Sequence, residues 1–254
     1  MTTIAVCIVT LGRDTLPAAL QSVCEQNLDG VEVLVGHADR HEYVRRLVSG
    51  MFPERGRTIR AEGSIPEARN TLLNTAKGEY IAVLDDDDRM CPGRLEYQRQ
   101  VLDETETVLI GQLAKYRSEI GPDGEYVEPE GFHAEDLEDG CALFHSSVMF
   151  ENRYRYRPKF SLCEDYDLFL RILDDVGESG VRMVAHDLAE SRTGHGSTVE
   201  RHPQLCSQFG VVAQMFHRER QQRGSDNYEE WTPVNVDRTA KDRDVSPLEV
   251  LGVI

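Results

Sequence analysis

Four consecutive aspartates, Asp85–Asp88, directly follow the apolar run Tyr80–Leu84. Carboxylates packed this closely repel one another, so they need a counter-charge or full solvation to stay ionised. If the apolar run is a buried strand, it delivers them to the edge where open α/β sheets bind ligands. Oxygen ligands of this kind suit hard divalent cations such as Mg²⁺ and Mn²⁺. The alternative interpretation is a solvated acidic turn that merely ends a strand.

Two further groups of residues could take part in the same chemistry. Glu164 and Asp165 open a predicted helix, and His195 lies between two glycines in a predicted loop. Each group by itself has a simpler explanation. Acidic residues favour the first turn of a helix because of its dipole, and a histidine between glycines is usually an exposed loop residue. The order and spacing of the three groups along the chain carry more weight than any one of them.

The elements that must position these residues alternate between strand and helix. Strands are expected at residues 3–9, 31–35, 57–61 and 80–84, where short apolar runs end at turn residues. Helical periodicity follows each of them, beginning with Asp14 as a helix cap and continuing near residues 16–26, 43–48, 66–76 and 92–102. This alternation predicts an α/β fold with a mainly parallel, doubly wound sheet.

The pattern changes after residue 106. A strand is expected at 107–113, a hairpin or excursion around the turn signal of residues 121–124, and an acidic loop at 130–140. Further expected elements are a strand at 141–150, a helix opening at 162–167, a last strand at 181–185 and a helix at 203–222. The polar residues beyond Gly224 are expected to be loosely held.

Composition narrows the functional classes. The chain has 254 residues, of which 40% are hydrophobic and 29% charged, and its net charge is −17. This charge disfavours non-specific binding to nucleic acid or anionic lipid. No apolar run approaches the roughly 18 residues of a membrane span, and the amino terminus is typical of a first strand, not of a signal peptide. The six cysteines form no C-x-x-C pair, which argues against zinc and disulfides and favours a cytoplasmic protein.

Taken together, the motifs resemble those of the family 2 glycosyltransferases, which are inverting nucleotide-sugar enzymes of the A-type fold. The resemblance runs from about residue 3 to residue 200, and its most specific part is the central signature. The segments that carry it are Ile4–Thr10, Pro66–Asn70, Ala76–Asp88, Cys163–Arg171 and Arg192–Thr198. It implies a catalytic domain at residues 1–200, with a nucleotide-binding half at 1–105 and an acceptor-side half with a small antiparallel region at 106–200. A C-terminal helix and polar tail follow at 201–254.

The resemblance also implies roles for individual residues. In the D-x-D pattern of the family, Asp85 faces the ribose and Asp87 binds Mn²⁺ or Mg²⁺, although four adjacent aspartates allow the register to shift by one residue. His195 would add a metal or diphosphate contact. Asp165 is implied as the general base that deprotonates the acceptor, with Glu164 as the second choice.

Donor binding is assigned by the same resemblance to Thr10, Leu11 and Arg13 after the first strand, together with Asp86 and Arg69. For Arg69, a place on the helix surface is the equally weighted alternative. The second strand departs from the family pattern. Where the family has an Asp-Asp-Gly-Ser type of sequence that meets the nucleotide base, this chain has Gly36-His37-Ala38-Asp39. Asp39 could make that contact from a shifted position.

The expected activity is transfer of a sugar from a UDP- or GDP-linked donor to a hydroxyl of a sugar, glycan or protein acceptor. One alternative is a nucleotidyltransferase of the same fold, although Thr10-Leu11-Gly12-Arg13 is a poor triphosphate loop. Another is an inactive carbohydrate-binding family member. A homodimer is left open. The acceptor is expected to meet residues 114–160, whose aromatic side chains could stack on sugars or simply pack; the Arg–Tyr alternation at 152–159 is either an anion or sugar surface or a solvated strand edge.

Overall fold

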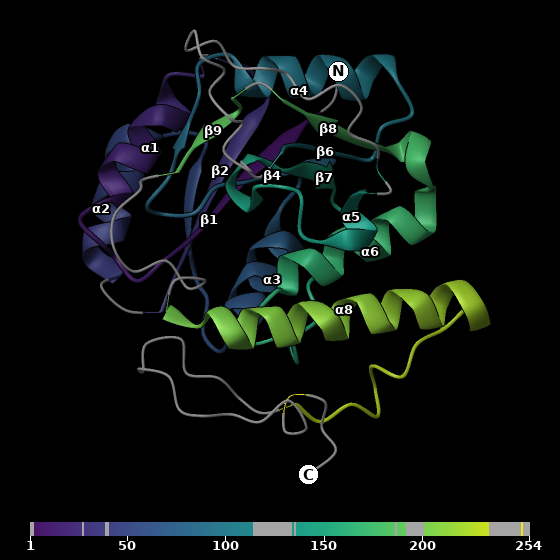
Figure 1. Ribbon diagram of the computed structural model, residues 1–254. Coiled ribbons are helices and arrows are strands. Elements are labelled where there is room, and N and C mark those ends of the chain that lie inside the picture. The colour runs from purple at the N-terminus through teal and green to yellow at the C-terminus, as the bar shows by residue number, and fades with distance from the viewer. Residues whose placement is uncertain are drawn as a thin grey trace, which may run out of the picture.

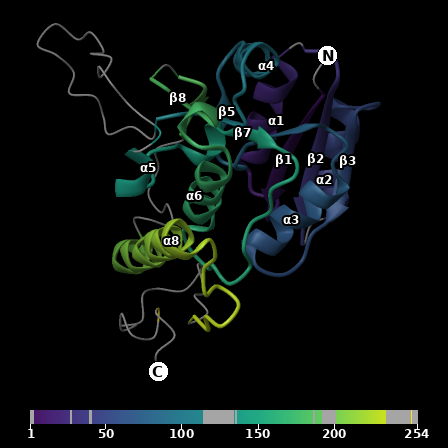
Figure 2. The same ribbon diagram turned by 90° about the vertical axis from the view of Figure 1, so that its right-hand side faces the viewer.

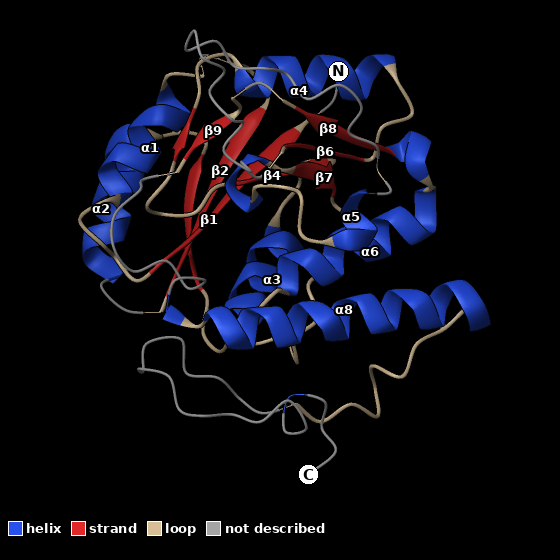
Figure 3. Cartoon of the chain, in the orientation of Figure 1, coloured by secondary structure: helices blue, strands red, loops and turns tan. Residues whose placement is uncertain are grey.

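A sheet lies at the centre of the protein. The structure is a computed structural model, in which residues 3–26, 28–38, 41–113, 134, 136–185, 187–191, 201–233 and 250 are described. The strands of the sheet are β1 (Ile4–Thr10), β2 (Val31–His37), β3 (Gly56–Arg60), β4 (Tyr80–Val83), β6 (Leu109–Gln112), β7 (Met149–Glu151) and β8 (Val181–Val184). In space they follow the order β3-β2-β1-β4-β7-β6-β8. Figure 3 shows the strands in red with helices around them.

Most neighbouring strands of this sheet run parallel. β1 pairs in parallel with β2 and β4, β2 with β3, and β6 with β8, whereas β7 runs antiparallel to both β4 and β6. The predicted α/β class with a mainly parallel sheet is therefore confirmed. Strands that are buried on both faces need apolar residues at successive positions, which explains why β1 and β2 appear in the sequence as continuous apolar runs.

Helices cover both faces of the sheet (Figure 1). On one face, Ile4, Val6 and Ile8 of β1 share a core with α1 (Leu16–Cys24), α2 (His41–Met51) and α4 (Arg94–Glu104). On the other face, Ala5 and Cys7 pack with α3 (Ile65–Thr75) and α6 (Glu164–Val176). Successive residues of a strand point to opposite faces, so this one strand contributes to both cores.

A final helix, α8 (Pro203–Arg223), packs on α6 on the side away from the sheet (Figure 2). An aromatic cluster continues that contact, consisting of Phe160, Phe209, Phe216, Tyr228 and Trp231. Tyr228 and Trp231 are both buried. Residues 225–233, which the polar sequence predicts to be loosely held, are therefore packed against the protein by these two side chains.

Several local predictions are corrected. The segment at 141–150 is not one strand, because a 3₁₀ turn, η1 (His145–Ser147), precedes the short β7. A one-turn helix, α5 (Asp136–Asp139), replaces part of the expected acidic loop. The N-cap position of α1 is Thr15 and not Asp14, and the Thr15 side chain makes no capping hydrogen bond. Two short strands that were not predicted, β5 (Arg89–Met90) and β9 (Ala189–Glu190), pair with each other, and a 3₁₀ turn, η2 (Glu178–Gly180), precedes β8. The predicted hairpin at 114–130 lies outside the described residues.

Across the described ranges, none of the helices is both long enough and apolar enough to cross a membrane.

Candidate active site

The strand order reverses beside β1, and the predicted donor residues at the ends of β1 and β4 meet at this point. β2 and β4 pair with opposite edges of β1, and all three strands are parallel, so their carboxyl ends share one edge of the sheet. Ligands of open α/β sheets bind in the crevice at such a reversal. β1 ends at Thr10 and leads into Leu11, which is 51% exposed, and Arg13, while β4 leads into Asp85–Asp88.

The Thr10 hydroxyl joins the two strand ends. It donates a hydrogen bond to Asp86 Oδ2 at 2.5 Å and accepts one from the Gly12 N–H at 2.8 Å. Arg13 Nη1 lies 3.4 Å from Asp86 Oδ1 and 3.1 Å from Asp87 Oδ2. Two segments more than seventy residues apart in the sequence are thus brought together, as the donor-site prediction requires.

The four aspartates alternate between exposed and buried positions. The side chains of Asp85 and Asp87 are 37% and 46% exposed, whereas Asp86 and Asp88 are each 6% exposed. Burial raises the pKa of Asp86, while its hydrogen bond from Thr10 opposes that change. The outward carboxylates are therefore the first and third of the run, which is the spacing of a D-x-D pattern.

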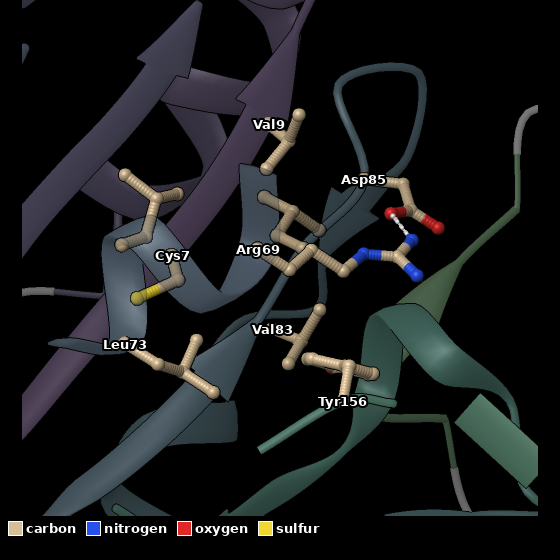
Figure 4. A pocket seen from close by; sticks show the side chains of 9 residues that line it. Cys7, Val9, Arg69, Leu73, Val83, Asp85 and Tyr156 are labelled. Carbon is tan, nitrogen blue, oxygen red and sulfur yellow. Dashed lines mark hydrogen bonds and ion pairs between the residues drawn. The ribbon is translucent and has the colours of Figure 1, made fainter. Parts of the chain in front are cut away.

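Arg69 of α3 connects the aspartates to the start of α6. Its Nη2 lies 3.0 Å from Asp85 Oδ1, and its Nη1 donates to Glu164 Oε1. Figure 4 shows the guanidinium reaching Asp85 above a small cavity with mainly apolar walls. Burial by itself would lower the pKa of Arg69, but Asp85 and Glu164 raise it, so the guanidinium stays charged. Arg69 is thus a partly buried bridge between Asp85 and Glu164 and not a solvated residue of the helix surface.

The two acidic residues at the start of α6 have different surroundings. Glu164 is 3% exposed and is held by Arg69. Asp165 is partly exposed, and its Oδ1 accepts a hydrogen bond from the Tyr166 N–H at 2.8 Å. Burial and the neighbouring Glu164 raise the pKa of Asp165, which His145 and Arg69 oppose. A partly exposed carboxylate with a raised pKa is better suited to accept a proton than one fixed in an ion pair.

His145 is a candidate site residue that the sequence analysis missed. Its Nδ1 lies 3.2 Å from Asp85 Oδ2 and 3.3 Å from Arg69 Nη2, and its Nε2 lies 3.1 Å from the Tyr156 hydroxyl. Burial would raise the pKa of Asp85, but His145 and Arg69 outweigh burial and lower it. The signal available in the sequence was the polar trio His145–Ser147, which interrupts an apolar run and marks a break in the expected strand.

The Arg–Tyr segment at 152–159 supports the fold. Arg157 pairs with Asp226 at 2.7 Å, Arg153 lies close to Glu151 and Asp175, and Arg155 donates to Asn74 at 2.6 Å. Tyr154 and Tyr156 are buried, which favours ordinary packing over sugar stacking for these two aromatics. The other aromatic residues considered for acceptor binding, Tyr116, Tyr126, Phe132 and His133, lie outside the described residues.

Two predicted site residues, Asp39 and His195, also lie outside the described residues. Within the described part of the chain, no three His, Cys, Asp or Glu side chains form a group that could hold a metal ion without other ligands. The outward carboxylates fit a hard cation that completes its coordination with phosphate oxygens, because Mg²⁺ is typically bound by one or two carboxylates and by substrate phosphates.

Comparison with known sequences decides the family. The sequence model of the family described as "Glycosyl transferase family 2" matches residues 5–165, from β1 to Asp165. The chain belongs to glycosyl transferase family 2. The match covers the central signature and ends at the Glu164–Asp165 pair, and therefore includes the described residues that form the candidate site.

Two similar proteins are named as glycosyltransferases, which is consistent with this family assignment. An uncharacterized glycosyltransferase of Rickettsia felis is 24% identical over 181 residues, which cover 64% of this chain and 30% of that protein. The UDP-Glc:alpha-D-GlcNAc-diphosphoundecaprenol beta-1,3-glucosyltransferase WfgD of Escherichia coli is 28% identical over 174 residues, covering 66% of this chain and 68% of that protein. The chain thus aligns with less than a third of the length of the first relative.

Solved structures agree at the level of the fold. The mannosyltransferase PcManGT from Pyrobaculum calidifontis, in complex with GDP-Man and Mn²⁺, has a TM-score of 0.63 at 15% identity, covering 89% of this chain and 66% of that one. The present chain therefore has the A-type glycosyltransferase fold, as its sequence motifs predicted.

Proposed function

We propose that this family 2 glycosyltransferase is an inverting enzyme that transfers a sugar from a UDP- or GDP-linked donor to an acceptor hydroxyl. The observation that carries the proposal is the juxtaposition of two outward aspartates, Asp85 and Asp87, with the partly exposed Asp165. The partly buried Arg69 connects the two groups through Asp85 and Glu164. The names of two similar proteins support the donor class, since one uses UDP-Glc and the other was solved with GDP-Man and Mn²⁺.

The donor would lie at the carboxyl ends of β1 and β4. Thr10 and Leu11 border the crevice, Asp85 is directed to the ribose, and Asp86 supports the Thr10 end of the site. Arg13, half exposed beside Asp86 and Asp87, can move to the diphosphate, because a guanidinium binds phosphate oxygens with paired donors. Asp39 remains the proposed contact to the base.

Asp87 is the proposed metal ligand, with His195 as a second. A bound Mn²⁺ or Mg²⁺ would offset the negative charge that develops on the departing diphosphate. The neighbouring carboxylates Asp85, Asp86 and Asp88 are hydrogen-bonded by Arg69, Thr10 and Ser146, respectively. This favours Asp87 as the carboxylate that binds the metal.

Asp165 is the proposed general base. It would take the proton of the acceptor hydroxyl while that oxygen attacks the anomeric carbon from the face opposite the diphosphate, which inverts the configuration. Arg69 forms an ion pair with Glu164, the residue before Asp165. Asp165 is therefore the carboxylate of the two that remains available to the acceptor. The step breaks the acceptor O–H bond and the bond between the anomeric carbon and the diphosphate oxygen, and it forms the new glycosidic bond. The proton stays on Asp165, and the nucleoside diphosphate is the leaving group.

Nucleotide-dependent melting tests the proposal. UDP or GDP at about a hundred times its dissociation constant should stabilise the protein by about 2.7 kcal/mol, which raises Tm by about 5–10 °C for a chain of this size. The shift should require Mn²⁺ or Mg²⁺, and Asp87→Asn should abolish the metal-dependent part. Release of a nucleoside diphosphate from a panel of sugar donors then identifies the sugar. A protein that responds to no nucleoside diphosphate, with or without metal, would refute the proposed function.

A further inference from the structure

The hydroxyl of Ser146 spans the whole run of four aspartates. It accepts a hydrogen bond from the Asp85 N–H at 3.1 Å and donates one to Asp88 Oδ2. Ser146 is fully buried in the turn η1. One side chain thus contacts both the first and the last residue of the segment that follows β4.

The same segment is closed by its own backbone. The Asp88 N–H donates to the Asp85 carbonyl at 3.2 Å, so the four aspartates form a tight turn. With its two ends fixed by Ser146, and Asp86 fixed by Thr10, Asp87 is left on the outer side of the turn. The alternation of buried and exposed carboxylates therefore depends on the side chains of Ser146 and Thr10, which fix the turn.

Arg94 of α4 fixes the position of Ser146. Its guanidinium is 1% exposed and donates to the backbone carbonyls of Ser146, Val83 at 3.1 Å and Val148 at 3.0 Å, while its Nε donates to Gln98 at 2.9 Å. Val83 is the last residue of β4. The five donors of a guanidinium have fixed directions, so this side chain sets the position of η1 relative to the end of β4.

We propose that Ser146 is a positioning residue that fixes the aspartate turn so that Asp87 faces the metal and the diphosphate, and that Arg94 holds Ser146 for this purpose. The inference rests on the proposed function, because it concerns the metal affinity of that same site. Partners that orient ligand residues commonly change metal affinity about 10- to 100-fold when they are removed.

Ser147 offers a matched control within the same turn. It is also fully buried, and its hydroxyl accepts a hydrogen bond from the Gln112 N–H at 2.8 Å, donates to the Phe144 carbonyl at 2.6 Å and lies 3.5 Å from the Gln112 carbonyl. These partners belong to β6 and the start of the turn and not to the aspartates. Ser146→Ala and Ser147→Ala therefore remove the same group from the same kind of environment.

The experiment measures the affinity for Mn²⁺ by paramagnetic resonance or calorimetry, with UDP present, or GDP if that nucleotide gives the larger melting shift. Both variants should lower Tm by a similar amount, because each loses one buried hydroxyl. Ser146→Ala should weaken Mn²⁺ binding by about tenfold or more, while Ser147→Ala should retain the affinity of the unchanged protein.

Equal losses of Mn²⁺ affinity in the two variants, or an unchanged affinity in Ser146→Ala, would overturn the positioning role while leaving the proposed function intact. If the unchanged protein shows no nucleotide-dependent Mn²⁺ binding, the proposed function fails first and this inference fails with it. Should Ser146→Ala not fold, Ser146→Cys keeps a group of similar size with a weaker donor and acceptor. It should weaken Mn²⁺ binding in the same direction, and an unchanged affinity there would count equally against the role.

Discussion

At the scale of single residues, the carboxylates of the candidate site differ in whether they form ion pairs with arginine. Glu164 forms an ion pair with Arg69, whereas Asp165 is partly exposed and carries a raised pKa. Adjacent residues on a helix point in different directions, so one can be buried while its neighbour faces the crevice. The sequence placed both residues in the site, but only the fold separates their roles.

Replacing Asp165 tests this separation. Asp165→Asn should lower kcat by about 10²- to 10⁴-fold, the usual contribution of a general base, while leaving nucleotide affinity and Tm nearly unchanged. Glu164→Gln is the comparison. It leaves Arg69 without one of its two carboxylate partners, so it should lower Tm and disturb Asp85. A loss of nucleotide binding in Asp165→Asn would contradict the assignment.

The pH dependence of kcat/KM gives a second measurement of the same residue. A general base must be deprotonated to act, so activity should rise with pH through the pKa of Asp165. Burial and Glu164 raise that pKa. The acidic limb should therefore lie above the value of about 3.9 that is usual for aspartate, and it should be absent from the residual activity of Asp165→Asn.

Residue-scale predictions from the sequence included residues that lie in the family motifs and missed His145, which lies outside them. The aspartate run, Arg13 and Thr10 were predicted to take part in one site, and their side chains are in contact. The role of His145 depends on Asp85, sixty residues away. That contact is created by the pairing of β4 with β7, so the polar trio His145–Ser147 marks a break in the expected strand but does not identify Asp85 as the partner.

At the scale of elements, periodicity predicted most strands and helices because apolar spacing is a local property. The misjudged segment, 141–150, is apolar on both sides of the polar trio His145–Ser147, and short apolar runs do not distinguish a strand from a buried turn. The 3₁₀ turn at His145–Ser147 is held by side chains of α4, namely Arg94 and Gln98. It is therefore a product of tertiary contacts.

Gly78 provides a test of how closely β4 must approach β1. A Cβ at this position would lie 2.7 Å from the Ile4 carbonyl carbon and even closer to the Ala5 nitrogen, and backbone atoms cannot move aside easily. Gly78→Ala should therefore lower the free energy of unfolding by about 1–3 kcal/mol, the usual cost of overpacking, as measured by urea denaturation.

Gly50 is the matched control for this substitution. It lies in α2, and a Cβ there would meet no atom within 4 Å. Because alanine is favoured over glycine in helices by about 0.5–1 kcal/mol, Gly50→Ala should leave stability unchanged or raise it. If both substitutions have the same effect, close packing at Gly78 is not what limits stability.

At the scale of the whole molecule, an acidic chain with a net charge of −17 uses its arginines to hold distant segments together. Asp226, which follows α8, receives Arg157 at 2.7 Å and Arg220 at 2.6 Å. Arg157 belongs to the segment before α6, so this carboxylate joins the segment after α8 to the segment before α6. The polar sequence after Gly224 did not predict this, because the partners of Asp226 come from other elements.

Asp226 should make the stability of the protein depend on pH. Burial would raise its pKa, but the hydrogen bonds from Arg157 and Arg220 outweigh burial and lower it. A carboxylate with a lowered pKa in the folded state stabilises the fold fully above its unfolded pKa of about 3.9, and this contribution is lost as pH falls through the folded value. Asp226→Asn should therefore cost about 3 kcal/mol at pH 7, and the difference from the unchanged protein should shrink below about pH 4.

The single tryptophan, Trp231, is buried beside Tyr228 in the segment that follows α8. Its fluorescence during urea unfolding therefore reports directly on the unfolding of this segment. Glu230→Gln is the control, since it removes an exposed carboxylate next to the same tryptophan and relieves the same amount of net negative charge. It should change stability by less than about 0.5 kcal/mol. A loss in Asp226→Asn that stays constant from pH 7 to pH 3 would show that packing around Asp226, and not its charge, joins α8 to the rest of the molecule.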